Sequence, residues 1–152
     1  MTTSTNQFTL AALATAALIF TAAATAAGQT KPAADATGVS VTVKYTGAGT
    51  VDDNRRIWVW IFDNPNIGPD SIPVGEQSIT KNGGTATFST TTPVYIAIAY
   101  DEKGGFMGQA PPPSGSPLAM YGMKGPNDPP QPVTPGAKGS VNITFDDSQR
   151  MP

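Results

Sequence analysis

Apolar and polar residues alternate with a two-residue period in two segments of the chain, as in a β-strand with one buried face. Residues 39–45 (VSVTVKY) alternate Val and Tyr with polar residues, and residues 140–145 (SVNITF) alternate Val, Ile and Phe in the same way. Residues 56–62 and 94–100 are apolar at nearly every position, which indicates central strands covered on both faces. These patterns predict an all-β fold.

Shorter strands are expected between turns rich in Gly, Asn and Pro. Residues 81–84 (KNGG) predict a hairpin turn between strands at 77–80 and 85–89, because Asn and Gly adopt positive φ at little cost. A Pro- and Gly-rich loop spans residues 102–139 and contains one strand-like segment, residues 117–122. Loops of this length are unusual in compact domains and are often functional. These short strands and the turns between them together predict an antiparallel β-sandwich of about seven strands, prealbumin-like or Ig-like.

The stretch 57–62 (IWVWIF) raises the question of what covers its second face. Trp58, Trp60 and Phe62 share one face of the strand, and we expect Tyr100 to join them from a neighbouring strand. Rows of Trp and Tyr on a sheet suit the stacking of sugar rings. Burying one Trp, however, stabilises a fold by about 2–3 kcal/mol. The face is therefore interpreted first as covered by the chain's own residues 109–135, with a sugar platform or a protein interface as alternatives.

The first thirty residues carry no charged side chain, and residues 8–27 are apolar and rich in Ala and Thr. This pattern predicts a signal peptide at residues 1–27 and a periplasmic or extracellular protein, although the leader lacks the usual Lys or Arg. The alternative is an uncleaved membrane anchor, since the stretch is long enough to span a bilayer. We expect a disordered spacer at 28–38, the sandwich at 39–147 and a polar tail at 148–152.

Composition excludes several classes of function. The net charge is −2 and the pI is about 4.8, so we expect no nucleic-acid partner, and no membrane contact beyond the export signal. The chain has no Cys and no His, so it has no disulfide, no thiolate metal site, no thiol nucleophile and no imidazole base. We predict a non-catalytic protein without a cofactor. A hydrolase using a pair of acidic residues is the less favoured alternative.

One acidic pair invites comparison with a calcium site. Asp101 and Glu102 precede two glycines at the end of a predicted strand. Calcium takes six to eight oxygen ligands, and the alternate positions after Asp101 are Lys103, Gly105 and Met107, which are poor ligands. A solvated turn that closes the strand is the favoured interpretation, and weak calcium binding is the alternative.

Three segments resemble a known group of domains: VYIAIAYDEKGG, GSPLAMYG and PVTPGAKGSVNITFDD. They are similar to segments of small exported bacterial domains with a prealbumin-like (transthyretin-like) or carboxypeptidase-regulatory-like sandwich. The resemblance implies an accessory module for protein–protein or cell-envelope contact, or for contact with an envelope polysaccharide. The transthyretin-like hydrolases of the purine pathway depend on His residues, which this chain lacks, so the resemblance does not carry their activity over.

Overall fold

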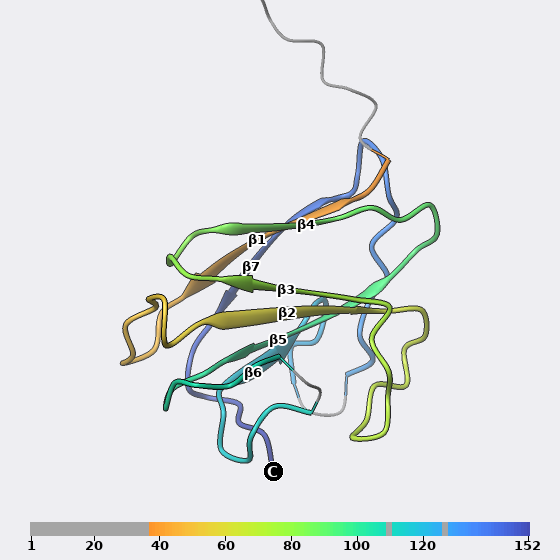
Figure 1. Cartoon of the computed structure of the whole chain (residues 1–152). Coiled ribbons are helices and arrows are strands. Elements are labelled where there is room, and N and C mark those ends of the chain that lie inside the picture. Colours follow the sequence, from red (N-terminus) through yellow and green to blue (C-terminus); the bar gives the residue numbers. More distant parts are fainter. Residues whose placement is uncertain (1–36, 109–110, 126–127) are drawn as a thin grey trace, which may run out of the picture. The chain divides into compact units, whose positions relative to one another are not determined.

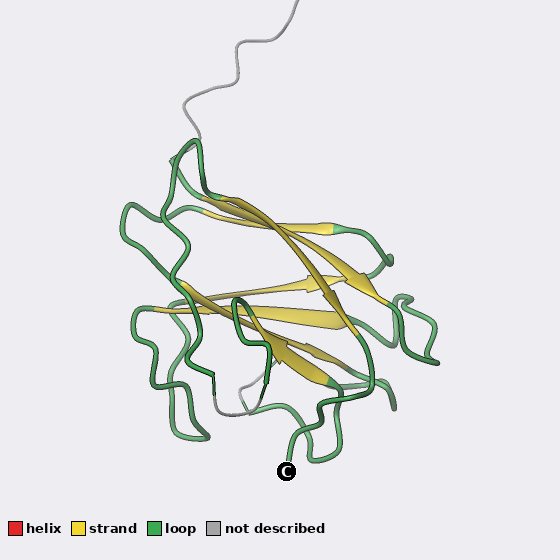
Figure 2. Ribbon diagram, turned by 180° about the vertical axis from the view of Figure 1, so that it is seen from behind, coloured by secondary structure: helices red, strands yellow, loops and turns green. Residues whose placement is uncertain are grey.

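The computed structural model describes residues 37–108, 111–125 and 128–152 (Figure 1). The predicted signal peptide and nearly all of the predicted spacer lie outside these residues. The described part contains seven strands in two sheets and no helix, which confirms the predicted all-β sandwich (Figure 2). No helix within it is long and apolar enough to cross a membrane.

The two sheets contain three and four strands. The three-stranded sheet has the order β4 (Thr85–Phe88), β1 (Val39–Tyr45) and β7 (Ser140–Phe145). The four-stranded sheet has the order β3 (Gly75–Ile79), β2 (Ile57–Phe62), β5 (Tyr95–Tyr100) and β6 (Leu118–Met120). All neighbours are antiparallel except β1 and β7, which run parallel. These two strands are joined only through the rest of the sandwich, so no hairpin forces them to be antiparallel.

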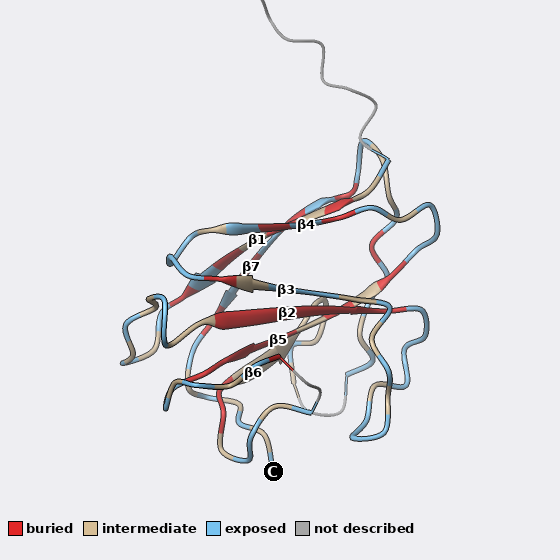
Figure 3. Ribbon diagram, viewed as in Figure 1, coloured by how far each residue is buried: buried red, intermediate tan, exposed pale blue. Residues whose placement is uncertain are grey.

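The core lies between the sheets, where the alternating residues of β1 and β7 meet the inner face of β2 and β5. Val39, Val41 and Val43 of β1 are completely buried, whereas Lys44 between them and Tyr45 is exposed. β2 is buried along its whole length, which sets it apart from the half-exposed β1 and β7 (Figure 3). Its outer face therefore needs a second cover outside the sandwich core.

The predicted hairpin at residues 81–84 is wrong, although the turn itself is present. β3 and β4 belong to different sheets, so the turn, with Gly83 at φ +80°, carries the chain from one sheet to the other. The side chain of Gln77 joins the two strands instead of a ladder. Its Nε2 donates to the carbonyl oxygen of Thr87 at 2.5 Å, and its Oε1 accepts from the Thr87 amide at 3.0 Å.

The polar residues at the end of the chain make backbone hydrogen bonds with the segment that leads into β6. The Leu118 amide donates to the carbonyl of Gln149 at 3.0 Å, and the Met151 amide donates to the carbonyl of Ser116 at 2.9 Å. An isolated bridge also pairs Pro117 with Arg150. The chain end thus lies along the start of β6, where it supplies backbone partners that an edge strand would otherwise lack.

Candidate functional site

The aromatic residues of β2 lie on the outer face of the four-stranded sheet, on one side of the strand as the alternation predicted. Trp58, Trp60 and Phe62 are only 7, 2 and 3% exposed. They form a second apolar cluster outside the sandwich core, packed against residues from two loops and from β6, including Ile67, Phe106 and Leu118. The described structure therefore presents a closed aromatic face rather than an open platform.

The cover of this face begins earlier in the chain than residues 109–135. The Phe106 ring packs edge-on against Trp58 and Trp60, with centroid distances of 5.7 and 6.2 Å. Trp60 Nε1 donates to the carbonyl of Gly108 at 2.9 Å, which fixes the loop over the sheet. Trp58 Nε1 is buried and has no hydrogen-bond partner among the described residues.

Tyr100 does not belong to this aromatic face. It lies directly opposite Ile57 in the β2–β5 ladder, and residues directly opposite in an antiparallel pair point to the same side of the sheet. Its ring is completely buried in the sandwich core, 4.4 Å from that of Tyr45, and its hydroxyl donates to the carbonyl of Thr50 at 2.9 Å. The prediction that Tyr100 joins the aromatic face was wrong because it assumed a register between two strands. Both strands are apolar on both faces, so their sequences do not show which residues share a face.

Asp101 organises the loop that covers the aromatic face. The residue is 5% exposed, so it is not in a solvated turn. One carboxylate oxygen accepts from the Gly104 amide at 2.9 Å and the other accepts from the Phe106 amide at 2.8 Å. The loop bends through Gly104 and Gly105, both at positive φ (+78° and +87°), which glycine adopts without strain.

Glu102, the second residue of the acidic pair, points elsewhere. Its carboxylate accepts from Arg150 Nη1 at 2.8 Å, so it forms an ion pair with the chain end while Asp101 binds backbone amides. Among the described residues no group of three or more acidic residues is close enough together to hold a metal ion. Calcium binding stays a prediction, and the two carboxylates are not jointly oriented toward it.

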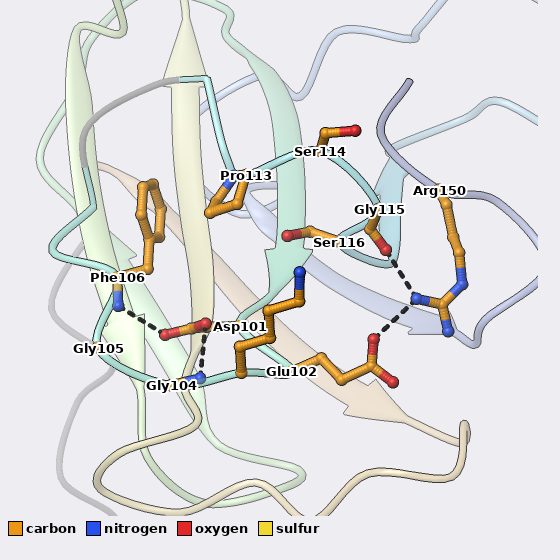
Figure 4. Close-up of a pocket in the computed structure, with 11 residues that line it drawn as sticks. Asp101, Glu102, Gly104, Gly105, Phe106, Pro113, Ser114, Gly115, Ser116 and Arg150 are labelled. Atoms are coloured by element: carbon orange, nitrogen blue, oxygen red, sulfur yellow. Dashed lines mark hydrogen bonds and ion pairs between the residues drawn. The ribbon is translucent and has the colours of Figure 1, made fainter.

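A cleft of about 570 Å³ lies between the Asp101–Phe106 loop and the segment 113–116 (Figure 4). The rings of Phe106 and Pro113 form apolar surface on one side, and the guanidinium of Arg150 lies on the other. Arg150 Nη1 also donates to the carbonyl of Gly115 at 2.7 Å, which ties the two walls to the chain end. Further lining residues carry hydroxyl or charged groups: Asp101, Glu102, Lys103, Ser114 and Ser116.

A buried tyrosine supports the Arg150 side of the cleft. The Tyr45 hydroxyl donates to Asp147, and Arg150 Nη2 lies 3.3 Å from the same carboxylate. The Tyr45 hydrogen bond and the Ala48 amide hold the pKa of Asp147 below its ordinary value. Burial, together with the Asp147 carboxylate, raises the pKa of Tyr45 well above its usual range. At neutral pH, Asp147 is therefore a carboxylate anion and Tyr45 is a neutral phenol.

Sequence reasoning found the loop but missed the cleft. It identified Asp101, Glu102 and the unusual length of the following segment, but it placed Arg150 in a polar tail and gave it no role in a site. No local signal places Arg150 beside Glu102, because the contact spans 48 positions and depends on the chain end docking along β6. Comparison of the chain with family models, with curated proteins and with solved structures gave no match.

Proposed function

We propose that the chain is an exported, non-catalytic β-sandwich module that binds a segment of a partner protein or of the cell envelope. The observation that carries the proposal is the cleft of Figure 4, whose volume of about 570 Å³ lies within the range of ligand sites, roughly 300–1,000 Å³. Export is supported by the uncharged apolar leader. A non-catalytic role is supported by a sequence without Cys or His.

The composition of the cleft suits recognition of a short extended segment. Phe106 and Pro113 supply apolar ring surface, while Lys103, Arg150 and the serine hydroxyls supply donors for carbonyl or carboxylate oxygens. Lys103 makes no ion pair among the described residues, so its ammonium is available to a ligand. The walls are held by Asp101 on one side and Arg150 on the other, which lowers the entropy lost on binding.

The experiment is cross-linking from the cleft in the organism that exports the protein. A photoreactive amino acid replaces Ser114, which is exposed in the cleft, and in a second strain it replaces Thr92, which is exposed in the β4–β5 connection. We expect one defined adduct from position 114, absent from position 92 and reduced by Lys103→Glu. The proposal is wrong if both positions give the same adducts or if Lys103→Glu leaves the adduct unchanged.

A carbohydrate ligand is the second candidate. It is favoured by the aromatic wall of the cleft and by Trp58 Nε1, a buried donor without a described partner beneath Phe106. A sugar ring that displaced Phe106 would reach both indoles and supply the missing acceptor. In that case Phe106→Ala would open the face and tighten glycan binding, whereas a ligand held in the cleft would lose its apolar wall and bind more weakly.

A further inference from the structure

The edge of β7 differs from the other sheet edges of the sandwich. On the outer edge of β4, the Gln77 amide bonds to both backbone groups of Thr87. The outer edge of β6 is partnered by the chain end, where the Leu118 amide donates to Gln149. β3 carries the exposed charge of Glu76, and a charged side chain on an edge strand discourages pairing with another strand. β7 has no charge, no proline and no second strand beside it among the described residues.

The hydrogen bonds to β1 show which backbone groups of β7 are free. The Gly139 carbonyl accepts from the Ser40 amide, and the Phe145 carbonyl accepts from the Thr46 amide, both at 2.8 Å. Odd-numbered residues of β7 therefore turn their backbone groups toward β1. The backbone groups that face away from β1 belong to the even-numbered residues: Ser140, Asn142 and Thr144.

We propose that two copies of this chain associate through antiparallel pairing of β7 with β7 across a two-fold axis at Asn142. This inference goes beyond the proposed function and does not depend on it. The register pairs Asn142 with itself and Ser140 with Thr144 of the second copy, so that all outward backbone groups find partners. It also keeps Val141 and Ile143 on the inner face in both copies, because a shift by an even number of residues preserves the faces.

Charge complementarity selects a second copy over an unrelated strand. In this register Lys138, in the turn at residues 136–139 that precedes β7, and Asp146 of the second copy, which directly follows β7, lie at the same end of the contact, and the symmetry repeats the pair. Both side chains are exposed, and neither makes an ion pair within its own chain among the described residues. Opposite charges placed across a strand pair stabilise it. The same two-fold contact is self-complementary, as isologous dimers require.

The inner side of β7 also has apolar surface left to cover. Val141 and Ile143 are 9 and 7% exposed, whereas Val39, Val41 and Val43 of the neighbouring β1 are at 0%. A groove lies between β7 and β6, lined by apolar residues that include Met120 and Phe145 and by polar residues that include Thr144 and Gln149. A strand added beside β7 would cover this side of the sandwich and join the two three-stranded sheets into one continuous sheet.

Sedimentation equilibrium of the exported chain tests the proposal. We expect a concentration-dependent dimer. Asn142→Pro removes an outward amide that the β1–β7 ladder does not use, so it should leave a folded monomer, whereas the control Asn142→Thr keeps the amide and should stay dimeric. Far-UV circular dichroism and the thermal midpoint check that the proline variant is folded. A monomer at every concentration, or a dimer unchanged by Asn142→Pro, would overturn the proposal.

A charge swap tests the same β7–β7 contact if the proline variant does not fold. Lys138→Asp brings two carboxylates together at each end of the contact in place of a charge-complementary pair, and we expect the dimer to dissociate at least about tenfold more readily. Asp146→Lys should weaken it similarly, and the double variant should restore it. A dimer that responds to neither change forms elsewhere on the molecule, and the β7 register is then wrong.

Discussion

Replacing Asp101 with Ala should both destabilise the fold and expose the tryptophans. Each carboxylate oxygen of Asp101 accepts one backbone amide, from Gly104 at 2.9 Å and from Phe106 at 2.8 Å. Hydrogen bonds to a charged group contribute about 1.5–3 kcal/mol each, so the variant should lose at least about 3 kcal/mol of unfolding free energy. At roughly 4 °C per kcal/mol for a domain of this size, the thermal midpoint should fall by at least about 12 °C.

Urea unfolding followed by tryptophan emission measures both effects. Without Asp101 the loop loses the bonds that hold Phe106 over Trp58 and Trp60, so the native emission should shift to the red even before unfolding. Glu102→Ala is the matched control, since it removes a neighbouring carboxylate whose side chain is 46% exposed and forms an ion pair with Arg150. Exposed ion pairs contribute about 0–1 kcal/mol, so the control should be nearly neutral. Equal stability and equal emission in the two variants would refute the role given to Asp101.

Three further predictions concern the loop, the pH dependence and the sheet edge. Gly108→Ala should cost at least 1 kcal/mol more in urea unfolding than Gly105→Ala, because both residues have positive φ but only at Gly108 would the added methyl overlap the Trp58 ring. The depressed pKa of Asp147 makes stability fall as the pH drops below about 4, and the raised pKa of Tyr45 makes stability fall above about pH 10; thermal midpoints across pH should show both losses, and Asp147→Asn should flatten the acid limb. Gln77→Ala should lower the unfolding free energy by about 1–3 kcal/mol, since it removes two hydrogen bonds to β4 that contribute about 0.5–1.5 kcal/mol each, and an unchanged midpoint in urea would contradict this.

The sandwich was predictable from the sequence because its strands carry their own pattern. Residues 39–45 and 140–145 alternate strictly, and the structure places β1 and β7 at the same bounds. The doubly apolar stretch at β2 correctly indicated a central strand with a second cover. These signals are local, since each strand must present one or two apolar faces whatever its neighbours are.

The structural features that the sequence did not predict depend on pairing between distant segments. The sequence does not contain the register that turns Tyr100 inward, the parallel pairing of β1 with β7 or the contact of Arg150 with Glu102. The turn at residues 81–84 predicted a hairpin because Asn-Gly favours one, yet the two strands diverge into separate sheets. Local turn chemistry fixes the turn, and only tertiary packing decides whether its flanking strands pair.

The Asp101–Gly108 loop closes the aromatic face, and we therefore propose that binding takes place in the neighbouring cleft. The most direct measurement is the emission maximum and acrylamide quenching of Trp58 and Trp60, the two tryptophans of the chain, with and without soluble polysaccharides. We predict blue-shifted emission and weak quenching that no polysaccharide changes. Emission near that of free tryptophan, or a blue shift caused by one glycan, would contradict the closed face and favour the sugar platform.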